Sequence, residues 1–316
     1  MIAIATFWAN LMASASLRET ESRAILSRLS HEQRRVLSDW RAFVLLRRAT
    51  LSLSPVERRW SELPATIEDV RPLLRRMVRQ GDLAPIRNAI QLYLVTVPYA
   101  NSLPPHEYEV LEESNPYAAI SHYSALVFHG LTLTFPKTLY ATSPRHLLQD
   151  VLPVGTRTSD WEGHDSRPKM RFPADVLGRD VEWTRAVQTR FFGDVEYEPY
   201  GYAVRIMSPE RTLLDGLVSP QLCGGIATVL EAWGQAIRTI NLELLFHYVE
   251  RFDMAVLRQR VGFVLESLGI HHPEIDAWQT QAQRGGSSVL VASEPYSSRF
   301  DERWSLSLNG PIELLD

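Results

Sequence analysis

The chain has 316 residues, 45% of them hydrophobic, which allows a substantial core and fits two domains better than one. No apolar run reaches the roughly 18 residues that a membrane-spanning helix needs, so we expect no membrane partner. The apolar opening, MIAIATFWANLMASAS, has no basic residue before its hydrophobic stretch, unlike a secretory signal. Cys223 is the only cysteine, which excludes internal disulfides and CxxC-type zinc sites and suits a reducing cytoplasm. These features predict a cytoplasmic protein in which Cys223 is a buried thiol.

The net charge of −4 conceals a difference between two parts of the chain. Residues 1–100 hold 15 arginines against 9 acidic residues, a net +6, whereas residues 101–316 hold 18 basic and 28 acidic residues, a net −10. The first part could attract a polyanion, and the second would repel one. Three prolines interrupt the chain at VPYANSLPPHEYEV, residues 97–110. We therefore predict an N-terminal extension over 1–28, a first domain over 29–100 and a second domain over 101–316.

Three helices are predicted in the first domain. Residues 30–48 begin with a Ser-x-x-Gln capping box at Ser30 and carry apolar residues at helical spacing. Residues 54–63 repeat the start signal, with Ser54 as N-cap followed by a proline at the first helical position. Residues 69–83 form the third predicted helix, which a glycine ends.

A strand pair is predicted after the third helix. In LAPIRNAIQLYLVTV, residues 83–97, apolar residues alternate on either side of a turn at Arg87, Asn88 and Ala89. Three helices followed by a hairpin is the order of a winged helix-turn-helix, an architecture that places its last helix in the major groove of DNA.

The arginines of the third predicted helix share one face. At 100° per residue, the apolar side chains gather on one side and the guanidinium groups on the other. Arginine suits DNA because its planar fork can hold a phosphate or bind guanine O6 and N7. An ordinary solvated basic face is the alternative. The predicted DNA-binding residues are Arg71, Arg75, Arg76 and Arg79 on this helix, Arg87, Asn88 and Gln91 on the hairpin, and Arg58 and Arg59 on the second helix, the last two as phosphate contacts.

The second domain opens on NPYAAISHYSALVFHGLT, residues 115–132, which contains two histidines. In a helix, His122 and His129 lie two turns apart, roughly 10 Å, too far for one zinc ion. Neither Ser121 nor Ser124 lies in a GxSxG motif, the turn that presents a catalytic serine in hydrolases. We therefore predict no catalytic residue, no metal and no cofactor here, and a small-residue helix that ends at Gly130 and packs into the core.

The rest of the second domain is predicted to be mixed α/β. We expect helices and strands in alternation, with an irregular, exposed loop at GTRTSDWEGHDSRP, residues 155–168. The predicted strands lie around 131–141, 181–206, 287–293 and 303–309, and the predicted helices near 209–218, 223–238 and 242–268.

Four segments in order carry a family resemblance: NPYAAISHYSALVFHGLT, PKTLYATSP, RIMSPERTLLDGLVSPQLCGGIATVLEAW and YVERFDMAVLRQRVGFVLESLGI. The most specific parts are SPERTLLD from Ser208 to Asp215, the Gly224-Gly225 that follows and the closing RWSLSLN. Over most of 60–316 the chain resembles the AbiEi-type antitoxins of bacterial abortive-infection (type IV) toxin–antitoxin systems.

The resemblance implies a winged helix-turn-helix ahead of an antitoxin domain. It also implies a repressor that binds repeats in the promoter of its own operon, on double-stranded DNA, and counteracts a nucleotidyltransferase-class toxin in phage defence. The hairpin reads RNAIQLY where that family has an Arg-Gly-x-Tyr turn, and the first 28 residues match nothing in it.

Two other functions stay open from the sequence. The chain could be a transcriptional regulator whose second domain binds an effector or dimerises. It could also be a metal-dependent nuclease or hydrolase, although the candidate residues lack metal-ligand spacing. Those residues are His122, His129, His164, Asp165 and Glu210.

Overall fold

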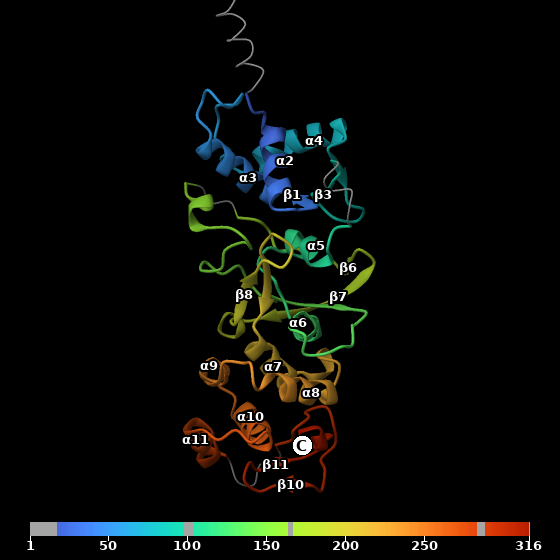
Figure 1. The fold of residues 1–316 in the computed structure, drawn as a ribbon, viewed down its shortest axis with the longest axis vertical. Coiled ribbons are helices and arrows are strands. Elements are labelled where there is room, and N and C mark those ends of the chain that lie inside the picture. The colour runs from blue at the N-terminus through green and yellow to red at the C-terminus, as the bar shows by residue number, and fades with distance from the viewer. Residues whose placement is uncertain (1–17, 98–103, 164–166, 283–287, 316) are drawn as a thin grey trace, which may run out of the picture. The chain divides into compact units, whose positions relative to one another are not determined.

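The computed structural model describes residues 18–97, 104–163, 167–282 and 288–315 (Figure 1). Most of the predicted N-terminal extension, including its apolar opening, lies outside the described residues. The fold is mixed α/β, as predicted. In the described part of the chain, no helix is long and apolar enough to cross a membrane.

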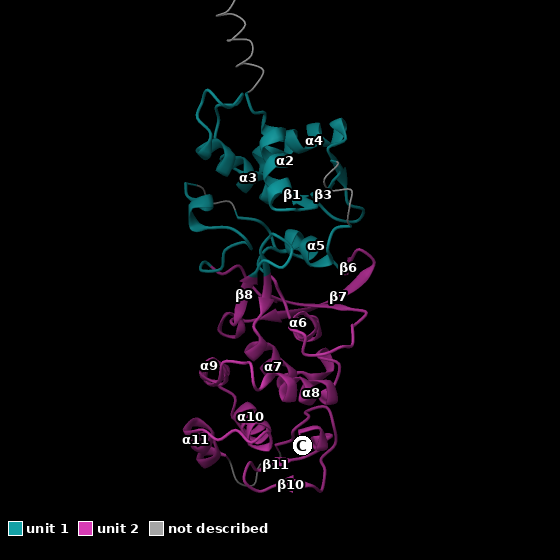
Figure 2. Cartoon of the chain, in the orientation of Figure 1, with its two compact units in different colours: residues 1–117, 149–173, 197–204 teal, residues 118–148, 174–196, 205–316 magenta. Residues whose placement is uncertain are grey.

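The chain folds into two compact units and passes from one to the other several times (Figure 2). Unit 1 comprises residues 1–117, 149–173 and 197–204; unit 2 comprises 118–148, 174–196 and 205–316. The sequence instead predicts one boundary near residue 100. The difference arises because two later segments pack with the N-terminal part, and no local signal marks such a return.

Unit 1 contains helices followed by a β-hairpin, in the predicted order. The hairpin's second strand, β3, also pairs with β1, which gives a three-stranded antiparallel sheet in the order β1-β3-β2. The elements are α2 (Glu21–His31), β1 (Val36–Ser38), α3 (Asp39–Ser52), η1 (Ile67–Val70), α4 (Arg71–Gln80), β2 (Leu83–Pro85), β3 (Leu92–Val95), α5 (Glu107–Ser114) and η3 (Thr158–Trp161).

The first predicted helix, residues 30–48, is wrong at its start. Ser30 lies in the last turn of α2, and the chain then turns through Gln33 at a φ of +54° and forms β1. Helix α3 begins only at Asp39, and its N-cap Ser38 accepts a hydrogen bond through its hydroxyl from the backbone N–H of Arg41 at 3.0 Å. The periodic run therefore contains the end of one helix, a strand and the start of another.

The second predicted helix, residues 54–63, does not form. The capping contact is present, since the Ser54 hydroxyl donates to Glu57 Oε2 at 2.6 Å, but it closes only a turn. Val56 is 70% exposed, so a helix here would bury no apolar face. The backbone instead continues into a bridge between Arg58 and Glu19.

The predicted exposed loop at residues 155–168 is confirmed only in part: in its described part, residues 157–159, 162 and 163 are exposed, but the segment is also anchored in the core. Trp161 is 6% exposed and packs in the core of unit 1, with its ring centroid 5.9 Å from that of Phe43. Arg48 of α3 binds both carboxylate oxygens of Asp160, at 2.6 and 2.8 Å. The polar residues of this segment suggest exposure, but several of its polar groups accept hydrogen bonds from arginines of α3.

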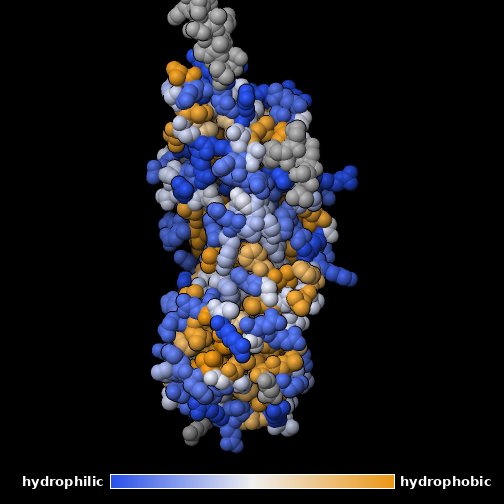
Figure 3. Space-filling model, in the orientation of Figure 1, coloured by the Kyte–Doolittle hydropathy of each residue, from blue (hydrophilic) through white to orange (hydrophobic). Residues whose placement is uncertain are grey.

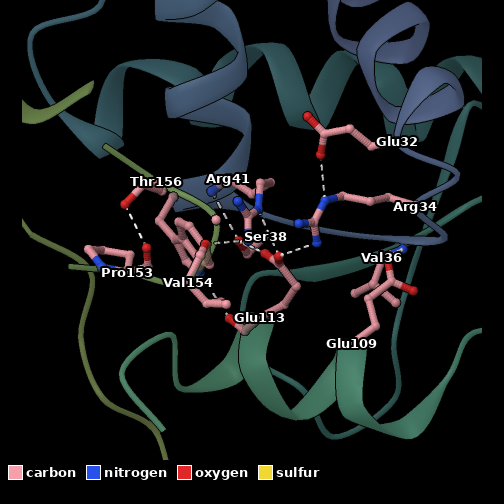
Figure 4. A network of polar contacts seen from close by, with 12 residues as sticks. Glu32, Arg34, Val36, Ser38, Arg41, Glu109, Glu113, Pro153, Val154 and Thr156 are labelled. Carbon is pink, nitrogen blue, oxygen red and sulfur yellow. Dashed lines mark hydrogen bonds and ion pairs between the residues drawn. The ribbon is translucent and has the colours of Figure 1, made fainter. Parts of the chain in front are cut away.

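Helix α5 is attached to β1, to the residues just before it and to the start of α3 by buried carboxylates (Figure 4). Glu113 accepts hydrogen bonds from Arg41 Nε at 2.8 Å and from the Ser38 hydroxyl at 2.5 Å, and its carboxylate lies 3.3 Å from Arg34. Glu109 accepts from the backbone N–H groups of residues 35 and 36 at 2.9 Å each. A carboxylate thus satisfies N–H groups at the start of β1, an edge strand.

Unit 2 is built around most of a six-stranded sheet in the order β6-β7-β5-β4-β9-β8, with parallel pairing of β5 with β7 and of β4 with β9. Its elements are β4 (Ala119–Ile120), α6 (His122–Phe128), β5 (Leu139–Pro144), β6 (Asp175–Val176), β7 (Arg179–Ala186), η4 (Gln188–Arg190), β8 (Asp194–Tyr197), β9 (Val204–Met207), α7 (Pro209–Val218), η5 (Pro220–Leu222), α8 (Ile226–Ala236), α9 (Leu242–Phe252), α10 (Ala255–Ser267), α11 (Pro273–Gln281), β10 (Phe300–Asp301), β11 (Leu306–Ser307) and η6 (Ile312–Leu315).

The predicted helices of unit 2 are confirmed where local signals define their ends. Helix α7 has the predicted bounds, with Ser208 as its N-cap. The predicted helix 242–268 is two helices, because Asp253 adopts a left-handed φ of +47° between them. The predicted helix over 115–132 is confined to α6, which Gly130 ends at a φ of +69°.

The predicted strands of unit 2 are confirmed less closely. Residues 131–138 are irregular and the strand begins at Leu139. The region 181–206 contains three strands rather than one, and the described residues of 287–293 contribute only an isolated bridge at Val289. Hydrophobic side chains gather over the part of unit 2 that carries α7, α8 and α10 (Figure 3).

Candidate nucleic-acid interface

Helix α4 has one buried and one basic face, as its sequence predicts. Leu73, Leu74 and Met77 are at most 5% exposed and pack in the core of unit 1. The helix ends at Gly81, whose φ of +82° allows the chain to turn into β2. The hairpin is fixed against this end, because the backbone N–H of Asp82 donates to Met77 and that of Thr96 donates to Asp82.

A groove of about 670 Å³ runs between α4 and the hairpin. Arg75 and Arg79 lie one helical turn apart on its rim, and both are exposed. No described residue forms a hydrogen bond or an ion pair with either guanidinium group. The full lining is Pro72, Arg75, Val78, Arg79, Pro85 and Tyr93.

The other two arginines of α4 are already paired. Arg71 lies 3.2 Å from Asp39 and 3.1 Å from Glu68, and its side chain is 34% exposed. Arg76 binds Glu21 of α2 at 2.7 Å. These carboxylates neutralise part of the positive charge, so the free cationic face of α4 is narrower than the sequence predicts.

The hairpin turn spans residues 86–91. The backbone N–H of Ala89 donates to Ile86 at 3.2 Å, which leaves Arg87 and Asn88 exposed at the tip. Asn88 has a φ of +62°, a left-handed conformation that asparagine tolerates. The predicted turn at this place is confirmed.

Gln91 differs from the prediction. It is half-buried, and its side-chain oxygen accepts a hydrogen bond from Arg171 at 2.6 Å. Its backbone φ is +57°. Gln91 therefore takes part in an internal contact, and it lies beside the exposed tip rather than on it.

The predicted phosphate contacts of the second helix are not on a helix. Arg58 is half-buried and donates to the carbonyl oxygens of Trp60 and Ser61 at 2.8 and 3.1 Å, which gives it a structural role. Arg59 is exposed and lies with Arg76 on a second cleft, of about 610 Å³.

Two groups that the sequence does not single out lie near this surface. Asp39 faces both Arg71 and Arg171, but burial raises its pKa above the usual range despite these cations. Burial and the neighbouring Asp39 raise the pKa of Tyr93, on the groove floor. Arg171 is 80 residues from Gln91 in sequence, so no local pattern could have revealed the pair.

The histidines of unit 2 have separate partners. His122 Nδ1 lies 2.8 Å from the Ser121 hydroxyl, whereas His129 Nε2 lies 2.7 Å from the carbonyl oxygen of Met207. Burial lowers the pKa of both, so both are neutral at pH 7. Glu210 accepts from the backbone N–H of Asn241, and the described residues contain no cluster of three potential metal ligands. The two remaining candidates, residues 164 and 165, lie outside the described residues.

The one cysteine, Cys223, is fully buried, as predicted. Burial, with a contribution from Asp215, raises its pKa well above the usual value. The thiol is therefore uncharged at neutral pH, and it packs in the apolar core of unit 2.

The likeness found between this chain and a known protein is a likeness of fold. No protein-family model matches the chain, and no curated protein is similar to it. Its structure is similar to the crystal structure of the RV2827C protein from Mycobacterium tuberculosis, with a TM-score of 0.53 and 13% sequence identity. The match covers 94% of each chain, so the likeness extends over both units, and at this identity it concerns the fold alone.

Proposed function

We propose that this chain is a DNA-binding antitoxin that represses its own operon and counteracts a nucleotidyltransferase-class toxin. In this proposal the first part of unit 1 is a winged helix-turn-helix, with α4 as the recognition helix and the β2–β3 hairpin as the wing. The order of its elements and its β1-β3-β2 sheet support that assignment. The antitoxin part comes from the resemblance to AbiEi-type antitoxins.

The observation that carries the DNA-binding proposal is the pair of free guanidinium groups on α4 beside the wing. Arg75 and Arg79 project from an exposed face whose opposite side is anchored in the core. A major groove of about 12 Å admits one α-helix, and arginine binds guanine bidentately there. The net +6 of residues 1–100 would attract the duplex.

The contacts of each arginine assign it a role in this proposal. Arg75 and Arg79 enter the major groove, and Arg87 with Asn88 at the wing tip contacts the backbone. Arg71 and Arg76 are secondary contacts, because each would have to share its donors with a carboxylate. Arg58 and Gln91 are not part of the proposed interface, because their side chains form hydrogen bonds within the protein.

The test of DNA binding uses a labelled duplex from the region upstream of the chain's own gene. We expect Arg75→Ala with Arg79→Ala to weaken binding by about 30-fold or more, since each such contact contributes about 1–3 kcal/mol and the two together about 2–6 kcal/mol. A matched control, Arg145→Ala with Arg238→Ala, removes the same charge from exposed positions of unit 2 and should leave binding unchanged. Equal binding by both double variants would refute the assignment of α4.

The test of antitoxicity uses co-expression with the neighbouring reading frame. If that frame is toxic, the full-length chain should restore growth. The Arg75→Ala, Arg79→Ala variant should bind the promoter only weakly. When it is expressed at a constant level from an unrelated promoter, it separates antitoxicity from promoter binding. A neighbour without toxicity would refute the antitoxin proposal and favour a plain transcriptional regulator.

A further inference from the structure

We infer that Arg171 positions the wing, and that the described residues 149–163 and 167–173 serve as a brace for the DNA-binding surface. This inference rests on the proposed function and deepens it. It assigns Arg171 a role in DNA binding although Arg171 does not itself contact the DNA. Its evidence is a set of contacts within unit 1 that join this later segment to α3 at one end and to the hairpin at the other.

The first part of the brace is fixed to α3 by three arginines. Arg41 donates to the carbonyl oxygen of Val154 at 3.0 Å, and Arg47 donates to that of Glu162 at 2.8 Å. Arg48 binds the Asp160 carboxylate and the carbonyl oxygen of Gly155. Because α3 belongs to the core on which α4 packs, the brace has a rigid foundation.

The far end of the brace reaches the wing. The backbone N–H of Arg171 donates to the carbonyl oxygen of Ser114 on α5 at 3.3 Å, which fixes the chain there. Its guanidinium group donates to Gln91 Oε1 at 2.6 Å. Gln91 is the last residue before strand β3, so this bond holds the base of the turn that presents Arg87 and Asn88.

The backbone of Gln91 needs such a contact. Its φ of +57° is left-handed, a conformation that costs a glutamine free energy and persists where the surroundings hold it. The hydrogen bond from Arg171 supplies that restraint. Without it, the turn is free to relax and its tip to move away from the backbone of the duplex.

Asp39 links the brace to the recognition helix as well. It forms an ion pair with Arg71 at the start of α4, and Arg171 is one of the cations that lower its pKa.

The experiment is a double-mutant cycle on promoter binding with full-length protein. We expect Arg171→Ala, Gln91→Ala and the double variant to weaken binding equally, by about tenfold, because the two residues act as one unit. The salt dependence should keep its slope, whereas loss of a phosphate contact would lower it by about 1. Additive losses or a reduced slope would overturn the inference and make Arg171 a direct DNA contact.

A second measurement does not depend on DNA. Hydrogen exchange of the amides over residues 83–95 should be faster in Arg171→Ala than in the natural protein. The matched control is Arg167→Ala, since Arg167 lies in the same segment and, among the described residues, donates only to the carbonyl oxygens of Gln149 and Val151 within it. Unchanged exchange in Arg171→Ala would refute the brace. Faster exchange in a protein that binds no promoter DNA would support the brace and refute the proposed function.

Discussion

Glu109 on α5 should make the stability of unit 1 depend on pH near neutrality. Burial, to which Glu113 adds, raises its pKa from 4.5 to about 7, although Arg34 and two backbone N–H donors lower it. A pKa raised in the folded state contributes stability that is fully present below pH 4.5 and is lost as the pH rises through 7. A change from 4.5 to about 7 corresponds to about 3 kcal/mol at pH 8.

The variant Glu109→Gln tests this reasoning. A glutamine oxygen can accept both backbone hydrogen bonds without a charge, so the variant resembles the protonated acid. We expect equal free energies of unfolding at pH 4.5 and a variant more stable by up to about 3 kcal/mol at pH 8. Urea unfolding followed by tryptophan fluorescence measures the difference.

The control is Glu62→Gln, an exposed change in the same unit, which should leave the pH dependence unaltered. Two results would refute the argument. One is a Glu109→Gln protein that stays less stable than the natural one by the same amount at every pH. The other is a natural protein whose stability does not fall relative to the variant between pH 4.5 and about 7.

Two further changes test packing and a buried ion pair. Gly262→Ala should destabilise unit 2 by roughly 3 kcal/mol, since a Cβ there would lie 2.0 Å from Trp304. Gly234→Ala is the control, because a Cβ there would meet no atom within 4 Å, and it should be neutral or stabilising. Equal effects of the two changes in thermal unfolding would contradict this. Asp160→Asn should cost about 2 kcal/mol at pH 7 by breaking the pair with Arg48. The pKa of Asp160 is low because Arg48 and a backbone N–H outweigh its burial, so the difference should shrink as the pH falls below 4; a constant difference in urea unfolding would argue against the ion pair.

Local signals explain what the sequence predicted well. Helix α7 was placed at its true bounds because its cap, its proline and its apolar spacing are adjacent in the chain. The basic face of α4 follows from the periodicity of ten residues, and the hairpin from alternation and a turn. In each case the residues that decide the structure lie within about one element's length.

Long-range contacts explain what the sequence could not predict. The start signal at Ser54 is real, but a helix also needs a surface to pack on, and none is available to Val56. The pairing of Arg71 and Arg76 with acids from other elements, and the bond from Arg171 to Gln91, join positions separated by 32 to 80 residues. Only the folded chain shows which arginines of the predicted site remain available.

Unit 1 is completed by segments that come late in the chain, and this has a consequence for folding during translation. Unit 1 acquires Val154 and Trp161 in its core, and Arg34 stacks over Tyr202 at 4.7 Å. During translation, the helices and hairpin made first must therefore wait until residue 204 has left the ribosome before their core is complete. A truncated protein that ends near residue 100 would expose apolar surface and would leave its normally buried arginines without partners. Such a fragment should therefore depend on chaperones or be degraded in the cell.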